Sequence, residues 1–163
     1  MSSVQSVKKM IYKSQKTGVM IDISSDLIAH FDTHRQIERG YEVGGQLFAR
    51  FPSASWVAIE KITGPRNNDR KFPCFFKPNA KSEQNEINDH FKQGYHFVGD
   101  WHTHPEKHPS PSSEDIANIA RIYQKSKHTL NSFILIIVGQ ALPPEGLYIG
   151  LHSACTIELC LPA

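Results

Sequence analysis

Two histidines and one aspartate near the middle of the chain are the residues best suited to chemistry. His102 and His104 lie in residues 99–105, which read GDWHTHP, and Asp115 follows eleven residues after His104. Side chains two residues apart in a β-strand point to the same face of the sheet, so both imidazoles would face the same way. Two imidazoles and one carboxylate leave the fourth position of a tetrahedral zinc ion open for water, as catalytic sites require. The spacing therefore predicts a zinc site, with iron as the alternative metal for the same ligands.

The segment that follows His104 must bring Asp115 back to the strand. Residues 105–111 (PEKHPSP) are rich in proline and lead into Ser112 and Ser113, which favour the start of a helix. We expect this helix to span residues 113–127, so that its first turn, with Asp115, faces the end of the strand. Ser112 would either cap this helix or donate a hydrogen bond to a carbonyl oxygen as negative charge develops on it.

These residues and their spacing resemble the JAMM pattern of JAB/MPN metallopeptidases, which reads H-x-H, seven residues, S, two residues, D. His102, His104, Ser112 and Asp115 meet that count without a gap. The resemblance covers about residues 24–139. It implies a JAB/MPN (cytidine-deaminase-like) fold and one Zn²⁺ per chain, and it favours the catalytic role for Ser112.

A second motif lies upstream, where residues 41–45 (YEVGG) are similar to the E-x-G-G strand that carries the catalytic glutamate of this family. A zinc ion lowers the pKa of its bound water to about 7. Glu42 would take the proton of that water as a general base and return it to the leaving amine as a general acid. The resemblance thus predicts a zinc metallopeptidase with catalytic residues Glu42 and Ser112 and with metal ligands His102, His104 and Asp115.

Within the family, GDWHTHPE and PSPSSED resemble a small bacterial branch that is encoded in CBASS antiphage operons. Members of this branch are deconjugating peptidases, and they are paired with ubiquitin-transfer-like machinery that attaches a cyclic-nucleotide synthase to target proteins. The resemblance therefore implies an isopeptidase whose substrate is a protein with an extended C-terminal tail. The alternative is a JAB peptidase that processes the C-terminus of a ubiquitin-like sulfur-carrier protein.

The hydrophobic periodicity predicts helices that alternate with hairpin-connected strands. Helices are expected over residues 25–38, 82–92 and 113–127. Strands are expected over residues 42–51, 56–63, 95–102, 133–138, 147–152 and 156–161, with an irregular edge strand over residues 72–78. We predict one domain over residues 1–163, with a flexible start over residues 1–8, built as an α/β (α+β) sandwich in which helices flank a mixed sheet.

Composition and charge narrow the possible partners. The 18 basic and 16 acidic residues are scattered along the chain, so we expect no nucleic-acid partner. The longest apolar run, residues 133–138, is far shorter than the roughly 20 residues of a membrane-spanning helix, so we expect a cytoplasmic protein without a membrane partner. Cys74, Cys155 and Cys160 form no C-x-x-C pair, and their odd number suits a reducing compartment.

Other readings of the chemistry fit the sequence less well. His30 and His34 lie one helical turn apart, but they lack the glutamate of H-E-x-x-H and a third ligand, so we expect them on an exposed polar face. Nucleobase deaminases also combine zinc with a glutamate, but their pattern is H-x-E with P-C-x-x-C, which the sequence lacks. A scaffold without activity would have no need for the complete set of candidate site residues.

Overall fold

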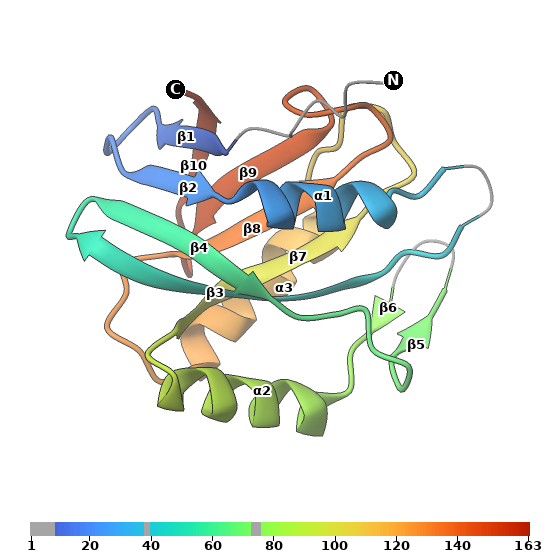
Figure 1. Ribbon diagram of the computed structural model, residues 1–163, viewed down its shortest axis with the longest axis horizontal. Helices are drawn as coiled ribbons and strands as arrows, with labels where there is room; N and C mark the ends of the chain where they lie inside the picture. The colour runs from blue at the N-terminus through green and yellow to red at the C-terminus, as the bar shows by residue number, and fades with distance from the viewer. Residues whose placement is uncertain (1–8, 38–39, 73–75) are drawn as a thin grey trace, which may run out of the picture.

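The computed structural model describes residues 9–37, 40–72 and 76–163 (Figure 1). The strands are β1 (Met10–Ser14), β2 (Met20–Ile23), β3 (Gly44–Ser53), β4 (Trp56–Ile62), β5 (Arg70–Lys71), β6 (Phe76–Lys77), β7 (His96–Thr103), β8 (Phe133–Val138), β9 (Leu147–His152) and β10 (Ile157–Pro162). The helices are α1 (Ser25–Thr33), α2 (Ala80–Lys92) and α3 (Ser113–Lys125).

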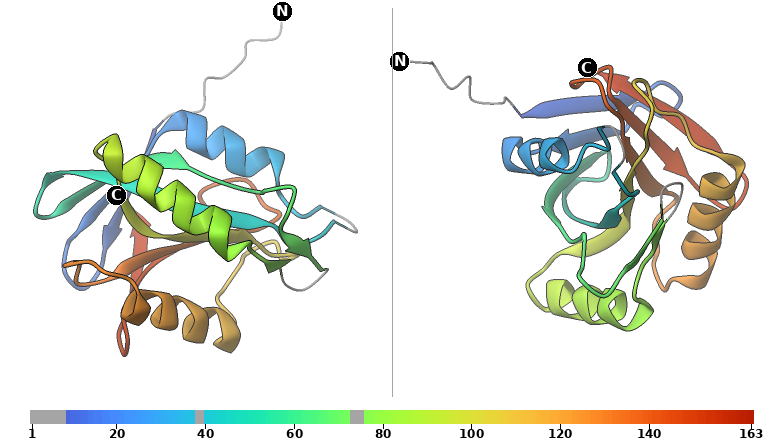
Figure 2. Two further views of the ribbon diagram at one scale, coloured as in Figure 1. Left: turned by 90° about the horizontal axis from the view of Figure 1, so that it is seen from below. Right: turned by 90° about the vertical axis from the view of Figure 1, so that its right-hand side faces the viewer.

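The main sheet is mixed, as expected, but it closes into a barrel instead of forming one layer of a sandwich. Its strand order is β1-β10-β9-β8-β7-β3-β4-β2, and β2 pairs with β1 to complete the ring. The pairs β7–β8 and β2–β4 are parallel, and the other neighbours are antiparallel. The hydrophobic periodicity of the sequence does not predict β1 and β2. These two short strands join β10 to β4, and for that reason the sheet has no free edges at its ends (Figure 2).

The main core lies where α1 packs against the barrel. Leu27, Ile28 and Phe31 of α1 are buried there together with Trp101 of β7, and the rings of Phe31 and Trp101 lie 5.2 Å apart. Trp101 is fully buried on the face of β7 opposite to His102, as strand alternation requires. The core therefore holds β7 firmly, and the other face of this strand is free to carry polar side chains.

A smaller apolar cluster attaches α3 to the other side of β8. Ile119 of α3 packs on Phe133, Leu135 and Ile137. All six residues of β8 are buried because alternate side chains face the main core and α3. In contrast, α2 has no buried side chain among its described residues. Its His90 ring stacks on Phe48 of β3 with the ring centroids 4.0 Å apart, and its N-cap is Asn79, whose side chain accepts from the Ser82 N–H.

The helix boundaries differ slightly from the predicted ones. α1 ends at Thr33 instead of residue 38 because the following residues bond elsewhere: Arg35 donates to the Gln140 carbonyl and the Gln36 carbonyl accepts from the Gln140 amide. α2 begins two residues earlier than expected, at Ala80, since the cap is Asn79.

Of the edge strand predicted over residues 72–78, residues 76–77 form β6, which pairs antiparallel with β5 in a separate two-stranded sheet. Residues 73–75, with Cys74, and residues 1–8 lie outside the described part of the chain.

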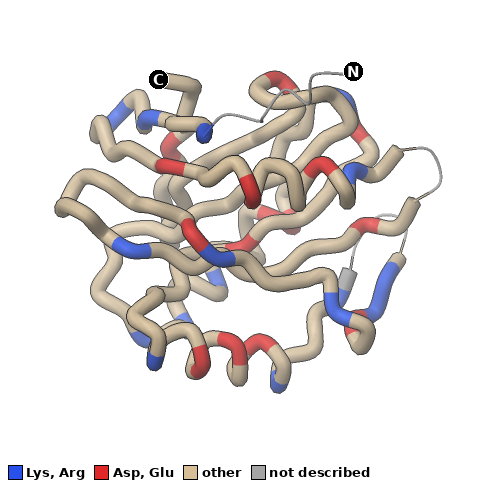
Figure 3. The backbone as a smooth tube through the Cα atoms, in the orientation of Figure 1, with Lys and Arg blue, Asp and Glu red and all other residues tan. Residues whose placement is uncertain are grey.

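Along the described part of the chain, the charged residues are as scattered as the sequence suggests (Figure 3). Basic and acidic residues are spread over strands, helices and loops (Figure 3). Among the described residues, no helix combines the length and apolar character needed to cross a membrane.

Candidate metal centre

The central strand β7 places both predicted histidine ligands. His102 pairs with Gly44 of β3 on one side and with Ile137 of β8 on the other. His104 lies just beyond β7, where its N–H donates to the Val138 carbonyl and keeps the backbone extended. Both side chains are buried, and their Nε2 atoms lie 3.1 Å apart. The two imidazoles therefore converge on one point, as the spacing predicts.

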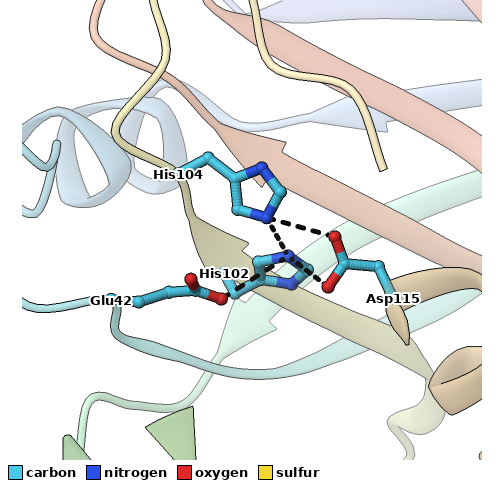
Figure 4. A group of neighbouring side chains, drawn as sticks. All are labelled: Glu42, His102, His104 and Asp115. Atoms are coloured by element: carbon cyan, nitrogen blue, oxygen red, sulfur yellow. Dashed lines mark hydrogen bonds and ion pairs between the residues drawn. The ribbon is translucent and has the colours of Figure 1, made fainter. Parts of the chain in front are cut away.

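The first turn of α3 brings Asp115 to the histidines (Figure 4). Ser112 and Asp115 form a capping box: the Ser112 N–H donates to Oδ2 of Asp115 at 2.9 Å, and the Asp115 N–H donates to Oγ of Ser112 at 3.1 Å. Oδ1 of Asp115 lies 3.2 Å from Nε2 of His102, and Oδ2 lies 3.1 Å from Nε2 of His104. The helix cap thus fixes the carboxylate between the two imidazoles.

Glu42 reaches the same place from the segment that precedes β3. Its N–H donates to the Phe72 carbonyl, and its neighbour Val43 accepts from the N–H of Thr103 at 2.9 Å. The strand predicted over residues 42–51 begins at Gly44, but these bonds still hold Glu42 beside β7. The Glu42 side chain is buried, and its Oε1 lies 4.0 Å from Nε2 of His102.

Gly45 allows the approach of the backbone that places this segment. A Cβ atom at this position would lie 1.7 Å from the Thr63 carbonyl oxygen and 2.9 Å from Nε1 of Trp101. The indole N–H of Trp101 donates to that same carbonyl at 2.8 Å. Any larger residue at position 45 would separate β3 from Trp101 and displace Glu42 from β7.

The four side chains have the chemistry of a metal site. One ligand atom from each of Glu42, His102, His104 and Asp115 lies within 4.8 Å of the others. Two ligands of a tetrahedral zinc ion lie about 3.3 Å apart. The separations of 3.1 to 3.2 Å among the His102, His104 and Asp115 atoms fit this geometry. Glu42 is set further back, which suits a group that acts on a water molecule beside the metal.

The two carboxylates in the centre differ in their affinity for protons. Burial raises the pKa of Glu42 to about 7, with His104 opposing the shift and Asp115 and Glu114 adding to it. Burial would also raise the pKa of Asp115, but hydrogen bonds from His102 and His104 outweigh it and hold that pKa well below its usual range. The low pKa of Asp115 favours the ionised form that a metal ligand would need, whereas the pKa of Glu42 lies near neutral pH.

His104 has an additional partner that the metal-ligand spacing does not predict. Its Nδ1 lies 2.9 Å from Oε1 of Glu106. A carboxylate on the second nitrogen of a ligating histidine fixes the ring and leaves the other nitrogen free to bind metal. The signal was present in the sequence, because Glu106 follows two residues after His104 and is the only acidic residue before Ser112 in that segment.

We expect Glu106→Ala to lower the affinity for added Zn²⁺ by about 10-fold to 100-fold, as removal of such outer partners does elsewhere. Competition with a chromogenic chelator measures this affinity. Glu60→Gln is the matched control because Glu60 is exposed on β4 and pairs with Arg50 at 3.8 Å. Equal Zn²⁺ affinities of Glu106→Ala and the wild type would show that Glu106 does not orient His104.

The second histidine pair lies in a different environment from the one that the sequence predicts. His30 and His34 are half-buried instead of exposed: their ring centroids lie 4.7 Å apart, and both rings pack against Trp101. Nε2 of His30 also lies 3.0 Å from the Gly64 carbonyl oxygen. Packing against the indole moves this face of α1 out of solvent. Cys155 is exposed and Cys160 is buried, and both are free.

Comparison with known proteins agrees with this geometry. A family model described as prokaryotic homologs of the JAB domain matches residues 24–147. The chain belongs to this JAB family. The matched residues include all four residues of the candidate centre. The solution structure of protein DSY2949 from Desulfitobacterium hafniense has a related fold, with a TM-score of 0.60. It is 22% identical in sequence, and the likeness covers 83% of this chain and 87% of the other.

Curated relatives of this JAB domain share one name. A CD-NTase/cGAS isopeptidase of Vibrio cholerae is 30% identical over 136 residues, which is 81% of this chain and 83% of the relative. A CD-NTase/cGAS isopeptidase of Enterobacter hormaechei subsp. hoffmannii is 26% identical over 148 residues, or 90% of this chain and 81% of the relative. The resemblance to the bacterial isopeptidase branch is confirmed by these relatives.

Proposed function

We propose that this protein is a zinc-dependent isopeptidase that removes a protein conjugated through its C-terminus from target proteins. The conjugated protein would be a cyclic-nucleotide synthase of a CBASS antiphage system, and the reaction would reverse ubiquitin-like conjugation in the cytoplasm. The observation that supports this most directly is the cluster of Glu42, His102, His104 and Asp115 in a chain whose relatives are named CD-NTase/cGAS isopeptidases.

His102, His104 and Asp115 would hold the zinc ion. When bound, zinc supplies Lewis acidity and lowers the pKa of a coordinated water to about 7. Glu42 would accept the proton of the attacking water and deliver it to the lysine amine as the carbonyl carbon–nitrogen bond breaks. Its separation of 4.0 Å from His102 leaves room for that water, and its pKa of about 7 allows both proton transfers.

Ser112 can combine the two roles that the sequence left open. Its Oγ accepts the hydrogen bond from the Asp115 N–H, so the hydroxyl hydrogen is available to another acceptor. Ser112 is exposed, whereas the carboxylate that it positions is half-buried. We infer that the hydroxyl group donates to the substrate carbonyl oxygen as negative charge develops in the tetrahedral intermediate.

A hollow beside the centre would receive the substrate tail. It has a volume of about 640 Å³ and is lined by Glu42, His102 and Asp115, by Lys77 and Pro78 next to β6, and by residues of α3. An extended chain can bind beside a short strand through main-chain hydrogen bonds, with pockets for alternate side chains. The short sheet of β5 and β6 makes such binding feasible next to the metal centre.

The test is to incubate the enzyme with a cyclic-nucleotide synthase of a CBASS system that is fused through its C-terminus to a second protein. We expect mass spectrometry to show a cut directly after the last residue of the synthase. Scrambling the last residues of the tail should reduce turnover, because only a flexible tail can reach a centre of buried side chains. As a control, substitutions on the folded surface of the synthase should change turnover less. Cleavage inside a folded domain, or unchanged turnover after scrambling, would contradict the proposal.

A further inference from the structure

A second hollow between α2 and α3 continues from the one at the metal centre. It has a volume of about 920 Å³. The two hollows have lining residues in common, namely Ala80, Glu83, Asp100, Arg121 and Ile122. Both views in Figure 2 show α2 and α3 as separate helices on the outside of the barrel. A chain bound at the metal centre could therefore extend into the space between the helices.

Two buried oxygen atoms at the floor of this second hollow lack hydrogen-bond partners. Asp100 of β7 lies two residues before His102 and on the same face of the strand, and Gln46 of β3 is its cross-strand partner. Gln46 is only 2% exposed. Within the described part of the chain, Oε1 of Gln46 and Oδ1 of Asp100 are buried without any partner. Buried polar atoms are nearly always paired, so this pair of acceptors requires a donor.

The described cations near the floor leave its two buried oxygens without a donor. Glu83 on α2 lines both hollows and adds a second carboxylate. The neighbouring cation, Arg66, is engaged by Glu86 at 2.5 Å and by Asp69 at 3.6 Å. Arg121 at the rim is exposed and hydrogen-bonds to Asn118. Lys125 and Lys127 also line this hollow and are exposed, and none of these cations donates a hydrogen bond to the two buried oxygens of the floor.

The walls of the hollow suit a long side chain with an apolar stem. Ile87 of α2 and Ile122 of α3 line the hollow above the floor and are half-buried. Lysine and arginine bury their methylene groups along apolar surface while the charged end reaches a polar partner. A lysine or arginine side chain therefore matches both the walls and the floor.

We propose that Asp100, Gln46 and Glu83 form a specificity subsite for a lysine or arginine side chain in the C-terminal tail of the substrate. This inference rests on the proposed function. Two residues of strand span about 6.6 Å, so Asp100 lies that far along β7 from His102. An extended substrate chain also advances by about 6.6 Å for every two residues. The recognised side chain therefore lies about two residues from the bond that is cut.

Tail peptides that end in a fluorogenic amide test the subsite. Each peptide carries Lys, Arg, Ala or Glu at one of the last four positions before the scissile bond. At one position we expect the wild type to show a kcat/KM about tenfold higher for Lys or Arg than for Ala, mainly through KM, as a hydrogen bond to a charged group provides. Asp100→Asn and Glu83→Gln should each bring this ratio close to one, whereas Glu60→Gln should leave it unchanged.

The outcomes separate the subsite from the proposed function. Cleavage without any preference for Lys or Arg would overturn the subsite alone, and so would an unchanged kcat/KM ratio in both variants. Either result would mean that water molecules donate hydrogen bonds to the two buried oxygens. If the wild type cuts none of the tail peptides, the proposed function fails and the subsite with it. Thermal unfolding and metal content verify that each variant is folded. Because Glu83 lies on a half-buried helix face, Glu83→Gln keeps the test decisive even if Asp100→Asn does not fold.

Discussion

Replacement of Glu42 with glutamine should abolish hydrolysis and leave the metal in place. The amide has nearly the same shape, but it cannot accept the proton of the attacking water. General acid–base catalysis contributes about 10²-fold to 10⁴-fold, so we expect kcat to fall by at least this factor. The metal should stay because Glu42 lies further from His102, at 4.0 Å, than Asp115 does at 3.2 Å.

Two measurements decide the role of Glu42. Single-turnover kinetics on the fused synthase gives the loss of activity, and elemental analysis gives the metal content per chain. The exposed Glu60→Gln variant is the control for loss of a carboxylate elsewhere. A variant without metal would identify Glu42 as a ligand, and a variant with wild-type kcat would exclude it as the general base.

Replacement of Asp115 with alanine should remove the metal and, with it, all activity. The wild type should hold about one zinc ion per chain, because two imidazoles and one carboxylate make one open tetrahedral site. Loss of a partner that only orients a ligand weakens binding by about 10-fold to 100-fold. Loss of a ligand itself should therefore lower the affinity for zinc by more than about 100-fold. His102→Ala should have the same effect.

Asp115 also belongs to the capping box of α3, so the metal effect must be separated from an effect on folding. Asp115→Asn retains an oxygen that can accept from the Ser112 N–H, but it lacks the charge of the ligand. We expect both variants to lose metal. The melting temperature of Asp115→Asn should lie closer to that of the metal-free wild type than the melting temperature of Asp115→Ala does. A full zinc ion per chain in Asp115→Ala would show that Asp115 is not a ligand.

Residue types and their spacing were enough to predict the parts of the centre that depend on local geometry. His102 and His104 share a face because a strand has a period of two residues, and this holds whatever lies around the strand. Ser112 and Asp115 have capping-box spacing, which is a property of one helical turn, and the structure contains both of its hydrogen bonds. Each of these patterns extends over a few residues, so residue type and spacing are enough to predict it.

The contacts between segments that are far apart in the sequence became known only from the tertiary structure. Glu42 lies beside His102, sixty residues away in the chain, because Thr103 pairs with Val43 next to the β3–β7 ladder. The same ladder sets Gln46 opposite Asp100 and leaves two oxygens unpaired. Closure of the barrel depends in the same way on β1, which pairs with β10 from the other end of the sequence, and on β2, which pairs with β4. Strand register and the burial of each face select these long-range pairs, and neither is contained in the periodicity of a single segment.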